Sequence, residues 1–194
     1  MCRYSVHSVI LYCPSLERDI SVLLAAMPRA TVHISRRTEH GEDGCLQAHK
    51  EIVQESARLK DSSVWVVEDD CVFAQQFDLV KWQRDADWAQ ANGYDVMSGG
   101  STRTYDQRHV RDGMVEVSAF HSSHCLVYFE SGYEKMLNAV TPLDWSLGRD
   151  CGMRCVVVHP FVAVQRPAFS GIEQRHVDYI PLYAKHEAEL GGLL

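Results

Sequence analysis

The chain has 194 residues, of which 46% are hydrophobic and 23% are charged, and its formal net charge is -7. This composition is that of an ordinary globular protein and argues against disordered and membrane-spanning classes. The acidic balance argues against nucleic acid as a partner, because a nucleic-acid backbone calls for a basic face. The length fits one domain over residues 1–194.

Seven cysteines form no C-x-x-C pair, and their odd number leaves one without a partner in any full disulfide scheme. Reduced thiols in a cytosol-like compartment fit this pattern best. The first apolar stretch, Val9 to Tyr12, is too brief for a signal peptide core or a membrane span. We therefore expect a cytoplasmic protein without a membrane span.

Apolar runs and helical periodicity alternate along the first half of the chain. They predict strands at 7–12, 30–34, 64–67 and 95–98, helices at 15–27, 45–60 and 79–91, and a polar surface loop at 35–44. The second half is more irregular. It predicts antiparallel strands at 114–117 and 125–129, a helix at 132–140, a strand at 155–159 and a final turn at 187–190. The fold class is therefore α/β, with a mixed, mainly parallel central sheet flanked by helices.

The strand Val64 to Val67 is apolar throughout and runs directly into Glu68, Asp69 and Asp70. Ligands bind at the carboxyl ends of strands in such sheets. Strand alternation would point Glu68 and Asp70 to one side and Asp69 to the other. Two convergent carboxylates suit Mg²⁺ or Mn²⁺, which can bridge to a phosphate. The alternative interpretation is a polar turn after a core strand.

A glycine-containing segment, Gly41-Glu42-Asp43-Gly44-Cys45-Leu46-Gln47-Ala48-His49, lies ahead of this strand. Gly41 and Gly44 allow the backbone to pass close to a ligand, so Gly44 is a candidate binding position for the nucleotide. His49 shares a helical face with Val53 and is interpreted more readily as a half-buried packing residue than as a metal ligand.

These two motifs together resemble glycosyltransferase family 25, the lipopolysaccharide- and collagen-galactosyltransferase type. That family carries a G-E-x-G-C-x-x-S-H segment and then a strand ending in L-E-D-D. Here Ala48 replaces the serine and Val67 the leucine. Looser similarity at 15–18, 142–144 and 159–172 extends the resemblance over most of the chain. Small viral glycosyltransferase domains are similar in length and general fold.

The resemblance implies a single glycosyltransferase A (GT-A) domain, in which a Rossmann-like half binds a nucleotide sugar and the other half faces the acceptor. It implies that the acidic motif holds Mn²⁺ or Mg²⁺ against the donor diphosphate. Asp70 is then the first-choice metal ligand, Glu68 contacts the ribose or a metal-bound water, and Asp69 ligates or orients.

Other candidate site residues are scattered along the sequence. Asp144 resembles the late aspartate of the family and is the candidate catalytic base, although it could equally cap the helix from Trp145 onward. Tyr12 and Arg18 are candidates to contact the base of the nucleotide, and His176 is a candidate late metal ligand. Arg36 and Arg37 could counter phosphate charge, and no role carries over to His121 and His124.

We therefore expect a metal-dependent glycosyltransferase that moves a sugar from a nucleotide-sugar donor, a UDP-sugar, to a saccharide or glycan acceptor. A metal-dependent phosphohydrolase is one alternative. That reaction requires a nucleophilic aspartate followed closely by a hydroxyl residue, which Cys71-Val72-Phe73 does not provide after Asp70. A sugar-nucleotide-binding protein without catalysis is the other alternative.

Overall fold

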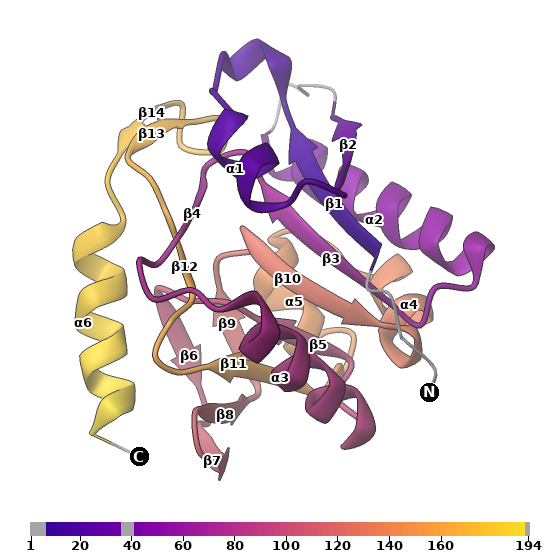
Figure 1. Cartoon of the computed structure of the whole chain (residues 1–194), viewed down its shortest axis with the longest axis vertical. Helices are drawn as coiled ribbons and strands as arrows, with labels where there is room; N and C mark the ends of the chain where they lie inside the picture. The colour runs from indigo at the N-terminus through magenta and orange to yellow at the C-terminus, as the bar shows by residue number, and fades with distance from the viewer. Residues whose placement is uncertain (1–6, 36–40, 193–194) are drawn as a thin grey trace.

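The computed structural model describes residues 7–35 and 41–192. Its main sheet has eight strands: β1 (His7–Tyr12), β2 (Thr31–Ile34), β3 (Ser63–Glu68), β5 (Val96–Ser98), β7 (Arg108–Arg111), β8 (Met114–Val117), β10 (Cys125–Phe129) and β11 (Cys155–Val158). They lie in the order β2-β1-β3-β10-β5-β11-β8-β7 (Figure 1).

Most strands of this sheet point in the same direction. β1 is parallel to both β2 and β3, and β5 is parallel to β11. β10 is antiparallel to both of its neighbours, β3 and β5, and β8 is antiparallel to β11 and β7. Within the sheet, β10 and β8 therefore oppose all the other strands, which confirms the predicted mixed, mainly parallel sheet.

Helices cover both faces of the sheet (Figure 1). They are α1 (Ser21–Ala26), α2 (Gly41–Leu59), α3 (Leu79–Ala91), α4 (Glu130–Leu137), α5 (Leu143–Arg149) and α6 (Ile180–Gly191). Side chains alternate along β3, so Val64 and Val66 pack in one apolar layer with α2, α4 and α5. Trp65 and Val67 pack in the other layer with α1 and α3.

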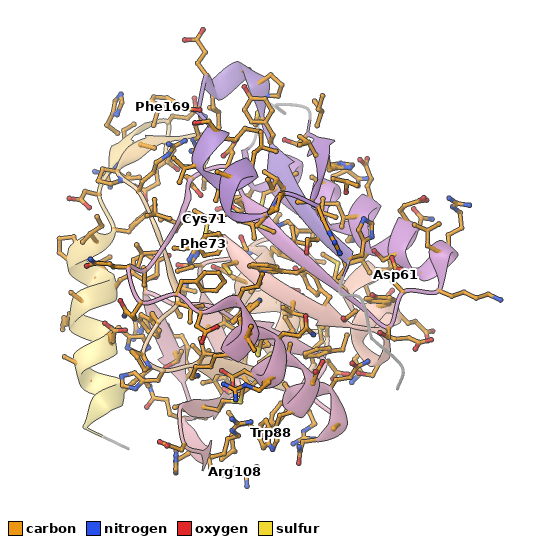
Figure 2. All side chains as sticks on the ribbon, in the orientation of Figure 1. Asp61, Cys71, Phe73, Trp88, Arg108 and Phe169 are labelled. Atoms are coloured by element: carbon orange, nitrogen blue, oxygen red, sulfur yellow. The ribbon has the colours of Figure 1, made fainter. Side chains whose placement is uncertain are left out.

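The layer on the α3 side is rich in aromatic rings. Phe73, which is labelled in Figure 2, stacks on Phe77 with 4.4 Å between ring centres. Trp65 lies 5.7 Å from Phe73 and 5.6 Å from Trp82. Rings of this size bury much apolar surface, so they fix α3 and the segment after β3 against the sheet.

Three small antiparallel pairs lie outside the main sheet, and one of them, β4–β12, joins the first half of the chain to the second. β4 (Cys71–Phe73) pairs with β12 (Ala163–Gln165), β6 (Arg103–Tyr105) with β9 (Ala119–His121), and β13 (Ala168–Ser170) with β14 (Arg175–Val177). The β4–β12 pair brings residues from late in the sequence beside the acidic end of β3.

Three predicted elements differ from the observed ones. The helix expected at 15–27 is a 3-10 turn, Pro14–Leu16, followed by α1, because Glu17 has a left-handed backbone with φ 53°. α2 begins at Gly41, so residues 41–44 are helical and place Glu42 and Asp43 in the first turn, where acids are favourable. Arg36 and Arg37, with the rest of 36–40, lie outside the described residues.

The final turn expected at 187–190 belongs to the longer helix α6, which begins at Ile180 and has a proline in its first turn. One side of α6 buries Tyr183, His186 and Leu190. Within the described residues, no helix combines the length and the apolar character that crossing a membrane requires.

Candidate functional site

A cavity of about 530 Å³ opens where β1 and β3 end. Its walls come from the ends of these two strands, the start of α2, residues 121–123, the start of α5 and the segment 165–179. The volume is in the range of small-molecule sites, and the carboxyl ends of parallel strands are where such sheets bind ligands. The fold therefore positions a candidate ligand site at the acidic motif.

The three consecutive acids do not follow the alternation of a strand. β3 ends at Glu68, and Asp69 and Asp70 form the turn before β4. Because the chain turns here, Asp69 and Asp70 both lie against Arg18, whereas Glu68 contacts α2. Strand alternation predicted that Glu68 and Asp70 would share one side, but it is Asp69 and Asp70 that share a contact partner. All three acids line the cavity.

Arg18 acts as an internal counter-ion for the two turn acids. Its Nη1 donates to Asp69 and lies 3.2 Å from Asp70 Oδ2, and its Nη2 donates to the Phe169 carbonyl at 2.7 Å. The Arg18 side chain is only 11% exposed, so solvent screens these contacts weakly. Burial raises the pKa of Asp69, and the charge of Arg18 offsets part of that increase.

Asp70 uses one of its two carboxylate oxygens for polar contacts within the described part of the chain. Oδ2 faces Arg18 and lies 3.3 Å from Gln165 Nε2, whereas Oδ1 is buried and has no hydrogen-bond partner among the described residues. Burial and repulsion by Glu68 raise the pKa of Asp70 to about 7, despite Arg18. A buried carboxylate oxygen without a partner fits a hard cation, which prefers oxygen ligands.

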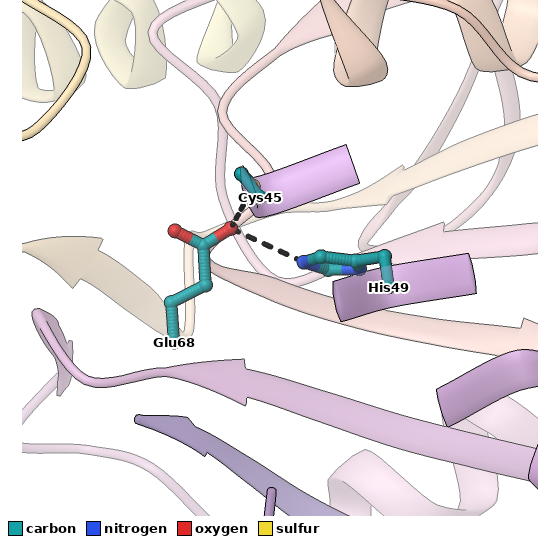
Figure 3. A group of neighbouring side chains, drawn as sticks. All are labelled: Cys45, His49 and Glu68. Atoms are coloured by element: carbon teal, nitrogen blue, oxygen red, sulfur yellow. Dashed lines mark hydrogen bonds and ion pairs between the residues drawn. The ribbon is translucent and has the colours of Figure 1, made fainter. Parts of the chain in front are cut away.

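Glu68 contacts three other side chains, of which Cys45 and His49 are drawn in Figure 3. Its Oε1 accepts a 2.5 Å hydrogen bond from Ser123 Oγ and lies 3.3 Å from His49 Nε2 and 3.6 Å from Cys45 Sγ. Burial disfavours the ionised carboxylate, but His49 and Ser123 outweigh burial and lower the pKa of Glu68 to about 2. Burial and the charge of Glu68 raise the pKa of the Cys45 thiol.

Asp144 lines the cavity and is bonded on both carboxylate oxygens. Oδ2 accepts from the Ser122 amide at 2.5 Å, and Oδ1 accepts from the Trp145 amide at 2.8 Å in the first turn of α5. Ser122 has φ 97°, which is strained for a residue other than glycine. Asp144 therefore stabilises the strained segment that carries Ser123, and it also contacts the helix start.

The structure brings most of the predicted site residues to the cavity and leaves two out. Those lining the cavity are Arg18, Gly44, Glu68, Asp69, Asp70 and Asp144. Tyr12 is not among the lining residues, and its carbonyl accepts from the Ser35 amide at 2.9 Å. His176 is exposed, lies outside the lining and packs edge-on against Phe169 at 5.7 Å, so it is not proposed further as a metal ligand.

Two residues with contacts to the acids were given no role from the sequence. Ser123 lies in a polar stretch without any distinguishing pattern. Gln165 stands in the late segment that resembles family 25, but spacing alone does not reveal its contact with Asp70. Gln165 Oε1 also accepts from Tyr183 Oη, which lies 3.1 Å from His124 Nδ1, so a hydrogen-bonded chain links α6 to the acidic turn.

No family model matches the chain, and no curated protein sequence matches it. Solved structures do share its fold. The protein A197 from STIV superposes with a TM-score of 0.56 at 13% identity, covering 89% of this chain and 93% of that one. UDP-glucose pyrophosphorylase in complex with UDP-glucose superposes with a TM-score of 0.51 at 11% identity, covering 94% and 81%. At these identities the likeness concerns the fold, and the resemblance to family 25 stays a prediction.

Proposed function

We propose that the cavity binds a nucleotide sugar together with a divalent cation, and that the protein is a glycosyltransferase acting from a UDP-sugar donor on a saccharide or glycan hydroxyl. The observation that carries this proposal is Asp70, whose buried Oδ1 has no partner among the described residues, in a cavity of about 530 Å³. The fold shared with UDP-glucose pyrophosphorylase in complex with UDP-glucose supports a sugar nucleotide as the ligand.

The donor set fits Mn²⁺ or Mg²⁺, because the turn offers carboxylate oxygens and no sulfur or imidazole ligand. Asp70 would hold the ion, with Asp69 as a further ligand or an orienting group. When bound, the cation stabilises negative charge on the departing diphosphate. Arg18, fixed by Phe169 and the two turn acids, supplies a second positive charge beside the same group.

Asp144 serves the acceptor side in this proposal. Asp144 lies in the first turn of α5 and lines the same cavity as the acidic turn. An ionised carboxylate can take the proton of a sugar hydroxyl as that oxygen attacks. Its two backbone hydrogen bonds fix the direction of the carboxylate, so orientation is set before an acceptor arrives.

The same cavity also fits nucleotidyl transfer, because one of the structures sharing the fold is a pyrophosphorylase. The two reactions differ in their products. Glycosyl transfer releases UDP, whereas the pyrophosphorylase reaction consumes pyrophosphate and UDP-glucose and releases UTP and glucose 1-phosphate. Incubation with UDP-glucose and Mn²⁺, with and without pyrophosphate, followed by nucleotide chromatography separates them. Donor binding without either product would favour a binding protein without catalysis.

Thermal-shift measurements with UDP-glucose test the binding step. Wild-type protein should gain thermal stability from UDP-glucose plus Mn²⁺, because a ligand that binds the folded state stabilises it. Asp70→Asn keeps the shape of the side chain, and it should lose the part of the melting-temperature increase that depends on Mn²⁺. Asp112→Asn makes the same change at an exposed position outside the cavity and should behave like wild type. An equal shift in wild type and Asp70→Asn would contradict the proposal.

A further inference from the structure

Cys45, His49 and Glu68 form a cluster that is chemically different from the acidic turn (Figure 3). We infer that these three side chains bind a zinc ion, at a site separate from the donor cation proposed at Asp70. The inference does not depend on the proposed function, because these three side chains would bind the zinc ion without any nucleotide present.

The backbone brings the three ligands together from two elements. Cys45 and His49 are four residues apart on α2, so they lie on the same helical face. Glu68 ends β3, which packs against α2 through the apolar layer described above. The candidate ligand atoms all lie within 4.8 Å of one another.

The distances from Glu68 Oε1 to the other two ligand atoms are close to those between the ligands of a tetrahedrally coordinated ion. Ligand bonds of about 2.0 to 2.3 Å in a tetrahedron place two ligand atoms about 3.3 to 3.6 Å apart. Here Glu68 Oε1 lies 3.3 Å from His49 Nε2 and 3.6 Å from Cys45 Sγ. These two distances already match tetrahedral coordination, and Cys45 Sγ and His49 Nε2, which lie within 4.8 Å of each other, would close on the ion to complete the set.

The outer partners orient the ligands. His49 is fully buried, and its Nδ1 lies 2.9 Å from Tyr128 Oη. When Nδ1 donates to this hydroxyl, the lone pair of Nε2 points toward Glu68, which is the arrangement of a metal-bound histidine. Ser123 holds Glu68 Oε1 at 2.5 Å. Cys45, Glu68 and Ser123 line the cavity, so water can supply the fourth ligand.

The ligand types select the metal. A thiolate, an imidazole and a carboxylate suit Zn²⁺, whereas Mg²⁺ prefers oxygen alone. On binding, the sulfur–hydrogen bond of Cys45 breaks, a sulfur–zinc bond forms, and the proton leaves to solvent. The bound ion would fix the first turns of α2 to the end of β3.

Cobalt substitution tests the site, because tetrahedral Co²⁺ bound to a thiolate has characteristic charge-transfer and visible absorption bands. Metal-free full-length protein titrated with Co²⁺ should develop these bands to a stoichiometric endpoint, and Zn²⁺ should abolish them. Cys45→Ser should lose the charge-transfer band. Cys13→Ser removes another half-buried thiol at the same cavity, and this variant should retain the charge-transfer band.

Two further results separate this site from the donor site. Asp70→Asn should keep the cobalt bands while losing Mn²⁺-dependent binding of UDP-glucose. Zn²⁺ should raise the melting temperature of wild type but not of Cys45→Ser, and circular dichroism should show that this variant is folded. Absence of the bands in wild type, or their persistence in Cys45→Ser, would overturn the site and leave only a hydrogen-bonded cluster.

Discussion

At the residue scale, Asp70 combines a raised pKa with the proposed role of cation ligand. Its ordinary pKa of about 3.9 is raised to about 7 in the folded chain by burial and by Glu68. A proton therefore competes with a cation for this carboxylate below neutral pH. The folded state holds this proton more tightly than the unfolded chain, so its stabilising effect is present below the ordinary pKa and is lost as the pH rises through the folded pKa.

We expect Mn²⁺-dependent binding of UDP-glucose to weaken as the pH falls below about 7, approaching tenfold for each pH unit. Titration calorimetry across this pH range, in buffers with different protonation enthalpies, measures both the affinity and the released proton. Glu68 has a pKa of about 2 and stays ionised throughout. A flat affinity over this range, without proton release, would contradict the role of Asp70.

Arg18 supports a second prediction at the same scale. Arg18→Met removes the counter-ion of Asp69 and Asp70 while keeping an apolar side chain of similar length. Loss of one partner from a buried ion pair should lower the free energy of unfolding by about 3 kcal/mol.

The loss should be smaller at acidic pH, because protonated Asp69 and Asp70 no longer need a counter-ion. Urea unfolding of wild type and Arg18→Met at neutral and acidic pH gives both values. Arg58→Met, at an exposed position on α2, should change stability little at either pH. Equal losses at the two pH values would show that Arg18 acts through packing alone.

At the element scale, the start of α2 is packed closely against the loop between β13 and β14. A Cβ atom on Gly41 would overlap the carbonyl group of Gly171, which is backbone and cannot rotate away. Gly171 itself has room, since the nearest atom to its added Cβ is Leu16 Cδ1 at 3.9 Å.

Gly41→Ala should therefore cost about 1 to 3 kcal/mol of stability and weaken ligand binding, because Gly41 and Gly171 both line the cavity. Gly171→Ala adds the same methyl group on the other side of the contact and should cost less than half as much. Thermal unfolding and UDP-glucose titration of both variants measure the difference. Equal effects would mean that the contact between these glycines is not tight.

The sequence predicts the elements whose patterns are local. β1, β3, β10 and β11 are continuous apolar runs, so their positions follow from composition and length. The short strands of the three small pairs carry too few residues for any periodicity, and β4 is further defined by a partner, β12, that lies far along the chain.

The same limit applies to the candidate site. The acidic motif after β3 can be located from the sequence, but its contacts come from distant segments. Ser123 is 55 positions from Glu68, and Gln165 is 95 positions from Asp70. Even the direction of Asp70 depends on where β3 ends and on Arg18, so the side on which each acid lies could not be derived from strand alternation.

At the scale of the whole molecule, one sheet separates two apolar layers, and the prediction of a single domain implies that they unfold together. Leu126 is fully buried in the layer on the α2 side, whereas Trp65 and Trp82 lie in the opposite layer. Leu126→Ala should lower the free energy of unfolding by about 2 to 5 kcal/mol.

Tryptophan fluorescence and far-ultraviolet circular dichroism should report the same shifted midpoint in urea, although Leu126 lies on one face of the sheet and three of the four tryptophans pack on the other. Leu182→Ala, on the exposed side of α6, serves as the matched control and should change the midpoint little. Separate midpoints for the two probes would show two independently unfolding units.

The reversed direction of β10 has a consequence for how this cavity can diversify. Because β10 runs against β3, its first residues, rather than its last, meet the end of β3, and the segment that precedes it forms one wall. This segment also contacts the end of β3, because Ser123 Oγ donates to Glu68 Oε1 and the Glu68 amide donates to the His124 carbonyl. Substitutions within 121–124 therefore change the rim of the cavity and the surroundings of Glu68 together, so this wall cannot be rebuilt independently of the acidic motif.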